Sequence, residues 1–111
     1  MVWYEFPASG TFIPGRISFR GRQDCCPNDG PTMWQFVGSN DEVCGKSGTW
    51  TVLCEDKSNT GFPHKAFTKY CDVNDKILTQ FRCLGVSVLN SGEKAGNTVL
   101  KDVRMWKKVY L

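Results

Sequence analysis

The stretch GRISFRGR, residues 15–22, decides the fold class of this chain. Its two large apolar residues, Ile17 and Phe19, alternate with Ser18, Arg20 and Arg22. Successive side chains of a β-strand point to opposite faces of a sheet, so this period of two places one face in a core and the other in water. The stretch therefore predicts a half-buried strand rather than a helix, whose faces repeat about every 3.6 residues.

Strand-like runs of this kind recur along the chain, with residues such as Gly, Pro, Asn and Asp between them. The other runs cover residues 2–6, 33–39, 50–55, 81–89 and 99–110. The polar segment 56–75 is predicted to be a loop with one short strand or turn near residues 66–70. Short strands divided by turn signals are typical of an all-β protein, specifically an antiparallel β-sandwich. We expect one such domain over residues 1–111, with little helix.

The alternation within each run also predicts which side chains share a face. The expected groups are Trp34 with Phe36, Trp50 with Val52 and Cys54, and Leu84 with Val86 and Val88. The last run, residues 99–110, carries apolar residues on both faces, as is normal for a strand that runs through a sandwich.

Length and composition narrow the classes of function. The chain has 111 residues, a formal net charge of +3, 41% hydrophobic residues and 13% aromatic residues. This apolar content can form a core, which excludes wholesale disorder. No apolar run approaches the roughly 18 residues that span a bilayer. The dispersed Lys and Arg residues carry too small a net charge to indicate nucleic-acid binding.

Six cysteines favour disulfides and an extracellular setting. An even number of cysteines in a small chain is typical of oxidised, secreted domains. Their spacing contains no paired zinc-ligand motif, so a structural metal is disfavoured. If the two adjacent cysteines pair with each other, the other four allow three pairings. We favour Cys54 with Cys71, which closes the long polar segment and leaves Cys44 with Cys83.

The sequence offers no catalytic motif. A nucleophile needs a base and an orienting third group within hydrogen-bond reach. The single histidine, His64, lies in a polar loop without a recognisable nucleophile motif beside it. The glutamates match no glycosidase-like motif, and no Gly-rich phosphate loop occurs. We therefore expect a protein that is not an enzyme.

The most distinctive local feature is the stretch RGRQDCC, residues 20–26. Cys25 and Cys26 either close a strained ring with a rigid apolar sulfur face or bond elsewhere as structural staples. Arg22 presents a planar fork of donors that Asp24 can hold in place, with Arg20 on the same polar side of the strand. Hydrogen-bond donors beside an apolar sulfur surface would form the combination of polar and apolar contacts that binding of a sugar needs. The alternative is a surface Arg–Asp ion pair, which is worth little energetically.

Several short stretches resemble the discoidin, or coagulation-factor type C, family. They are residues 3–6 (WYEF), 17–22 (ISFRGR), 36–41 (FVGSND), 50–53 (WTVL) and 99–110. Members of this family are galactose-binding-like jelly-roll sandwiches, so the resemblance implies a discoidin-like jelly roll over most of the chain. Within the family, residues 22–26 are similar to the motif of fucose-binding lectins (fucolectins). There an Arg-x-Asp precedes adjacent cysteines whose disulfide packs on the sugar.

The chain departs from the family pattern at several positions. The family usually has an early strand and ligand-facing loops before the first strand of this chain, so we expect a sandwich shortened at its N-terminus. The fucolectin motif has a second basic residue where this chain has Asp29, and a His further upstream. The resemblance thus implies Arg22, Asp24 and the pair Cys25–Cys26 as ligand-binding residues. Calcium is not supported, because the family's calcium site draws on the absent N-terminal region.

These observations predict an extracellular, non-catalytic module that binds a glycan or glycoprotein. Arg22 would donate to sugar hydroxyls, Asp24 would orient Arg22, and Cys25–Cys26 would supply apolar contact, with Arg20 nearby. Single monosaccharide sites are usually weak, so useful binding would need several copies. No cofactor or metal is expected.

The alternative is an adhesion or matrix module that binds protein or a membrane surface, as a homo-oligomer or as part of a larger assembly. The family also includes members that bind phospholipid through exposed apolar loop tips. Here the candidate tips are residues 12–13 and 62–63, although each is better explained as a buried anchor of its loop, because isolated apolar residues in loops carry little functional information. Residues 1–6 lack the features of a signal peptide, so secretion would imply a leader already removed or a longer chain.

Overall fold

The computed structural model describes residues 1–6, 13–21, 30–91 and 100–108, and the regular secondary structure in these ranges is β-structure. Seven strands occur in these ranges. They are β1 (Val2–Glu5), β2 (Pro14–Arg20), β3 (Pro31–Ser39), β4 (Thr51–Asp56), β5 (Thr68–Asp72), β6 (Cys83–Ser91) and β7 (Lys101–Lys107). The same ranges contain no helix, and so none that is long and apolar enough to cross a membrane.

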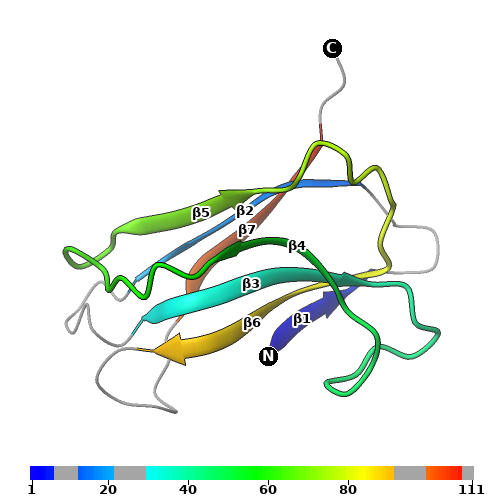
Figure 1. Cartoon of the computed structure of the whole chain (residues 1–111), viewed down its shortest axis with the longest axis horizontal. Coiled ribbons are helices and arrows are strands. Elements are labelled where there is room, and N and C mark those ends of the chain that lie inside the picture. Colours follow the sequence, from blue (N-terminus) through cyan, green and yellow to red (C-terminus); the bar gives the residue numbers. More distant parts are fainter. Residues whose placement is uncertain (7–12, 22–29, 92–99, 109–111) are drawn as a thin grey trace.

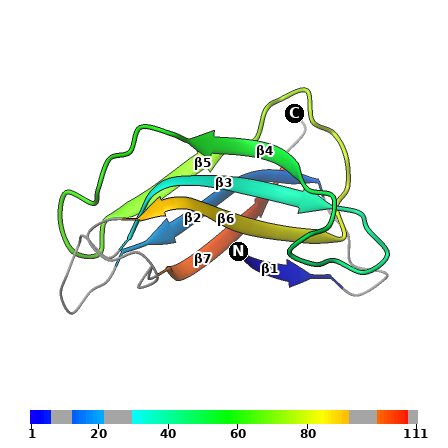
Figure 2. The same ribbon diagram turned by 60° about the horizontal axis from the view of Figure 1, so that its bottom comes forward.

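The strands form two antiparallel sheets that face each other (Figure 1). One sheet has the order β1-β6-β3-β4 and the other has the order β5-β2-β7. Figure 2 shows the two layers from another side, with β4 beside β5 at one edge and β1 beside β7 at the other. This arrangement confirms the predicted all-β class and the antiparallel β-sandwich.

β2 fills the centre of the core with the residues that its alternation predicts. Ile17 and Phe19 are completely buried, as are Trp34 and Phe36 of β3. The rings of Phe19 and Trp34 meet edge to face with centroids 4.8 Å apart, a geometry that the ring quadrupoles favour. Residues of β6 complete the same layer, namely Leu84, Val86 and Val88. The contacts between Phe19 and Trp34 therefore join the two sheets at their middle.

β4 differs from the prediction that Trp50, Val52 and Cys54 share one face. Leu53 is the buried residue of this strand, at 2% exposure, whereas Val52 is 42% exposed. The register of β4 on β3 shifts between Cys54 and Val52, so Leu53 is the extra residue of a β-bulge. A bulge interrupts strict alternation, and as a result both Leu53 and Cys54 contact the core.

β7 also differs from its prediction. The run 99–110 was expected to pass through the sandwich, but β7 is an edge strand of the smaller sheet and its side chains are mostly exposed. Met105 packs against the core together with Leu100, which precedes the strand, while Trp106 is 47% exposed. The apolar residue on the other face of β7, Trp106, is therefore at the surface.

Two disulfides have the connectivity that the sequence favours. Cys54 of β4 bonds to Cys71 of β5 and so ties the edges of the two sheets together. Cys44, in the segment between β3 and β4, bonds to Cys83 at the start of β6. The adjacent cysteines of residues 25–26 lie outside the described residues.

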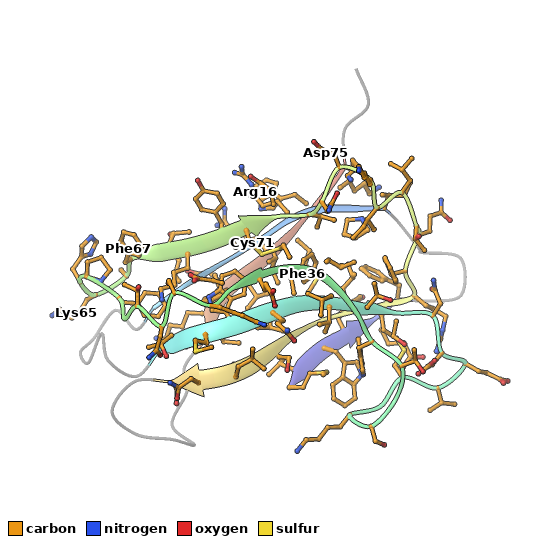
Figure 3. The ribbon with its side chains drawn as sticks, viewed as in Figure 1. Arg16, Phe36, Lys65, Phe67, Cys71 and Asp75 are labelled. Carbon is orange, nitrogen blue, oxygen red and sulfur yellow. A yellow bond between two sulfur atoms is a disulfide. The ribbon has the colours of Figure 1, made fainter. Side chains whose placement is uncertain are left out.

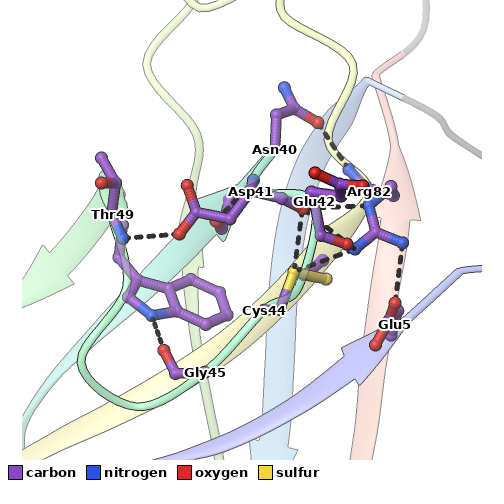
Figure 4. The surroundings of a disulfide bond; sticks show 11 residues. Glu5, Asn40, Asp41, Glu42, Cys44, Gly45, Thr49 and Arg82 are labelled. Atoms are coloured by element: carbon purple, nitrogen blue, oxygen red, sulfur yellow. Dashed lines mark hydrogen bonds and ion pairs between the residues drawn. A yellow bond between two sulfur atoms is a disulfide. The ribbon is translucent and has the colours of Figure 1, made fainter.

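Arg82 fixes the segment that joins β3 to β4 (Figure 4). Its Nε donates to the carbonyl oxygen of Asp41 (3.1 Å), and Nη2 donates to the same oxygen (2.9 Å) and to the carbonyl oxygen of Glu42. Nη1 donates to the carboxylate of Glu5 (2.7 Å). Because the protein's own acceptors occupy this guanidinium, Arg82 has a structural role.

Lys69 is a buried cation that contacts the segment between β4 and β5. It is 8% exposed, and its ammonium group donates to the carbonyl oxygens of Pro31 (3.0 Å) and Thr60. The ammonium nitrogen also lies 4.5 Å from the centre of the Phe62 ring. Burial lowers the pKa of Lys69, and the negative charge of Asp56 partly offsets this effect.

Opening the crosslink between β4 and β5 should destabilise the sandwich. The substitutions Cys54→Ala and Cys71→Ala together remove a bond that spans a sequence separation of 17. The greater freedom of the unfolded chain then lowers the free energy of unfolding by about 3 kcal/mol. Urea unfolding followed by tryptophan fluorescence measures the change. Equal free energies of unfolding for this variant and the wild type would contradict the assigned crosslink.

The burial of Lys69 should make stability depend on pH. Between its lowered pKa in the folded protein and its ordinary value of 10.5, the unfolded chain binds this proton more tightly than the folded chain. The free energy of unfolding of the wild type should therefore rise with pH in this window, relative to that of Lys69→Met. Urea unfolding of both proteins at neutral and alkaline pH measures the difference. A difference that is independent of pH would contradict this account.

Candidate functional site

The outward face of the β5-β2-β7 sheet gathers charged and aromatic side chains. β2 is the central strand, so its outward residues have neighbours on both edge strands. The register gives three cross-strand rows: Asp72–Arg16–Trp106, Tyr70–Ser18–Arg104 and Thr68–Arg20–Lys101. Residues directly opposite each other on one face lie close enough for their side chains to interact.

A hollow opens in this face because its central residue, Ser18, is small. The neighbours of Ser18 are larger: Arg16 and Arg20 along β2, and Tyr70 and Arg104 across the sheet. The hollow has a volume of about 420 Å³. We call it the outer basin and define it by its lining residues, Arg16, Ser18, Arg20, Thr68, Tyr70, Asp102, Arg104 and Trp106.

Arg16 is held in place at one end of the outer basin. Its Nε and Nη2 donate to the two carboxylate oxygens of Asp72, at 2.6 and 3.3 Å. The guanidinium carbon lies 4.6 Å from the centre of the Tyr70 ring, a cation–π contact. The hydrogen bond to Asp72 raises the pKa of Arg16. Figure 3 shows Arg16 pointing away from the opposite sheet, so this cation faces outward.

Trp106 separates the outer basin from a second hollow. Its side chain is 47% exposed and makes no ring–ring contact with another aromatic residue in the described part of the chain. The second hollow, about 640 Å³, shares Arg16 and Trp106 with the outer basin and continues toward Asn74 and Lys108. A partly exposed indole between two hollows offers an apolar face for stacking, with polar groups on either side.

Two β-bulges shape the ends of the outer basin. The first is at Gly15, where a Cβ atom would lie 2.9 Å from the Cα of Lys108, so only glycine allows this approach of the chains. The second is beside Asp102, which has a φ of 49°, a left-handed conformation that aspartate tolerates. There the Asp102 carboxylate lies 3.4 Å from Nη1 of Arg20.

The three guanidinium groups of the outer basin differ in how many of their N–H donors are already bonded to other groups of the protein. Arg16 makes the paired contact with Asp72. Arg20 makes only two long contacts, with Asp102 and with the carbonyl oxygen of Ala66, both at 3.4 Å. Arg104 has no hydrogen bond or ion pair within the described ranges. Arg104 and Arg20 are therefore the groups that can bind a ligand.

The structure places one predicted site residue in this basin. Arg20 lines it, whereas Arg22, Asp24 and Cys25–Cys26 lie outside the described residues, so their arrangement stays a prediction. Sequence reasoning missed the other residues that line the basin. The alternation of β2 was a signal for Arg16, but the strand containing Tyr70 was predicted only as a short strand or turn.

Other features of the described chain carry less functional information. Phe62, a candidate membrane-contacting tip, is 5% exposed and packs in the core as a buried anchor. An apolar groove of about 440 Å³ lies between β1 and β7, and Trp3, Val103 and Met105 are among its lining residues. No cluster of three or more His, Cys, Asp or Glu side chains suited to a metal occurs in the described residues.

The residues of the outer basin should be dispensable for folding. Arg16 and Asp72 are both about half exposed, at 47% and 60% of their side chains, and exposed ion pairs contribute up to about 1 kcal/mol. We therefore expect Arg16→Ala to change the free energy of unfolding much less than the substitution of a core residue does. Thermal and urea unfolding measure this. A loss comparable to that of a core substitution would assign Arg16 to the fold rather than to a site.

Comparison with known proteins does not identify a family for this chain. The chain matches no protein-family model, no curated protein and no solved structure.

Proposed function

We propose that the protein is a non-catalytic, extracellular module that binds a carbohydrate or glycoconjugate through the outer basin. The observation that carries the proposal is the hollow floored by Ser18 and walled by Arg16, Tyr70, Arg104 and Trp106. Its volume of about 420 Å³ falls within the range typical of small-ligand sites. Sugars present apolar ring faces and polar edges, and the basin offers aromatic rings beside hydrogen-bonding side chains.

Binding without catalysis is supported by the chemistry of the lining. Asp102 is the one carboxylate among the described lining residues, and no histidine or cysteine accompanies it. Glycoside hydrolysis generally needs two carboxyl groups that flank the scissile bond. The basin therefore has groups that hold a ligand but lacks a paired acid and base.

The disulfides Cys44–Cys83 and Cys54–Cys71 support the extracellular setting, because such bonds persist in oxidising compartments. The motif at residues 22–26 begins just after Gly21, at the end of β2 that carries Arg20. The predicted ligand-binding residues Arg22, Asp24, Cys25 and Cys26 thus follow β2 closely in the sequence, and their arrangement stays a prediction.

Filling the outer basin tests this function. Ser18→Tyr places a ring on the floor of the hollow, whereas Ser18→Ala leaves it open, and both residues fit the outward face of a strand. On a glycan array, we expect Ser18→Tyr to weaken binding about tenfold or more and Ser18→Ala to change it by less than about threefold, because bulk displaces the ligand. Circular dichroism and thermal unfolding confirm that both variants fold.

The array also separates the alternatives. If Arg22→Ala abolishes glycan binding and Ser18→Tyr does not, the sugar binds the loop at residues 22–26 rather than the basin. If the wild type binds no glycan on the array, the carbohydrate function is rejected. An adhesion module that binds protein would then be the better explanation.

A further inference from the structure

We propose that the outer basin selects anionic glycans, and that a sulfate or carboxylate substituent binds between Arg20 and Arg104 while a sugar ring stacks on Trp106. This inference rests on the proposed function and names the class of glycan. The charge and hydrogen-bonding chemistry of the basin carry it.

Hydrogen-bond donors outnumber acceptors in the outer basin. A guanidinium group has five N–H donors and no acceptor, and three such groups line the hollow. Asp102 is the lining carboxylate, and both oxygens of the neighbouring Asp72 already accept hydrogen bonds from Arg16. A neutral hydroxyl accepts at only one oxygen and brings a donor of its own, whereas a sulfate or carboxylate presents several oxygens that only accept. The excess of donors therefore favours an anionic substituent.

The charges in and beside the outer basin are also unbalanced. Among the lining residues, Arg16, Arg20 and Arg104 are cationic and Asp102 is anionic. Asp72, beside the basin, offsets Arg16, which leaves one positive charge in excess among these five residues, and Lys101 opposite Arg20 adds a further cation at this face. The excess is local, because Arg16 is paired with Asp72 and Arg20 only loosely with Asp102. It falls on Arg104, which has no anionic partner in the described part of the chain.

The positions of these groups fit one ligand. Arg104 lies directly opposite Ser18, and Arg20 follows Ser18 by two residues on the same face of β2. An anion above Ser18 would thus contact both guanidinium groups. Trp106 is two residues along β7 from Arg104, or roughly 6.6 Å at the rise of an extended strand. A sugar ring that carries the anion at Arg104 can therefore contact the indole.

Three probes of the same glycosaminoglycan oligosaccharide test the inference: the native sulfated form, a desulfated form and a carboxyl-reduced form. Binding to the full chain is measured by isothermal titration calorimetry or by surface plasmon resonance. We expect the native form to bind at least about tenfold more tightly than whichever form lacks the recognised anion, since hydrogen bonds to a charged group are stronger than those between neutral groups. Loss on desulfation identifies sulfate as the recognised group, and loss on carboxyl reduction identifies carboxylate.

Charge substitutions locate the anion. Arg104→Gln should weaken binding of the native form about tenfold, because it removes the unpaired guanidinium. Lys46→Gln makes the same change in net charge on an exposed residue between β3 and β4, and should alter binding less than about twofold. Asp102→Asn should strengthen binding about twofold to threefold, because it frees Arg20, and asparagine tolerates the left-handed backbone at this position.

The possible results distinguish this inference from the proposed function. If all three probes bind equally and Ser18→Tyr abolishes binding, the basin binds neutral sugar and only the anionic selectivity is overturned. If Lys46→Gln weakens binding as much as Arg104→Gln, the attraction is one of net charge and the assigned anion site is wrong. If no probe and no neutral glycan binds the wild type, both the inference and the proposed function fail.

Discussion

The edge-to-face contact between Phe19 and Trp34 determines which side of β2 faces the second sheet. Both rings are fully buried, so this side of the strand cannot turn outward without losing the centre of the core. A shift of one residue in the pairing of a strand moves all its side chains to the opposite face. The outward positions of Arg16, Ser18 and Arg20 therefore follow from the burial of Ile17 and Phe19, and core and basin are two sides of one alternating strand.

Arginine residues illustrate how a folded chain divides one chemical group between structure and recognition. The guanidinium of Arg82 is occupied by backbone carbonyl oxygens and by Glu5, and it fixes a loop. Arg16 is occupied by Asp72, but its position over Tyr70 shapes a wall of the basin. Arg104 is exposed and has no such partner within the described ranges. The occupancy of the donors, more than the presence of arginine, distinguishes the proposed binding residue from the structural ones.

The sequence predicted the sandwich and the buried face of β2, because that strand alternates without interruption. The two described disulfides also followed the expected connectivity, since Cys54 and Cys71 flank the long polar segment. The buried face of β4 was harder to predict, because the bulge at Leu53 changes which side chains enter the core. The amino-acid composition of the strand does not indicate such a bulge. The apolar residues of 99–110 favoured an interior strand, but its place at the edge of a sheet depends on pairing that a sequence does not reveal.

The candidate site was also predictable only in part, because it depends on which strands pair with each other. Arg20 was identified from its strand, yet the basin exists because Tyr70 and Arg104, 34 residues apart in the numbering, lie on opposite sides of Ser18. Only the order of strands in the sheet brings them together. The motif at residues 22–26 was visible as a local pattern, and its geometry lies outside the described residues.

The two long edges of the sandwich are held in different ways. Cys54–Cys71 joins the sheets covalently at the β4–β5 edge, whereas an apolar groove lies between β1 and β7 at the other. Every residue of β1 is exposed, and among the described strands β1 pairs only with β6, while β3 is paired on both sides. We therefore expect brief separation of the sheets to begin at the β1–β7 edge, and the amide hydrogens of β1 to exchange with deuterated solvent long before those of β3.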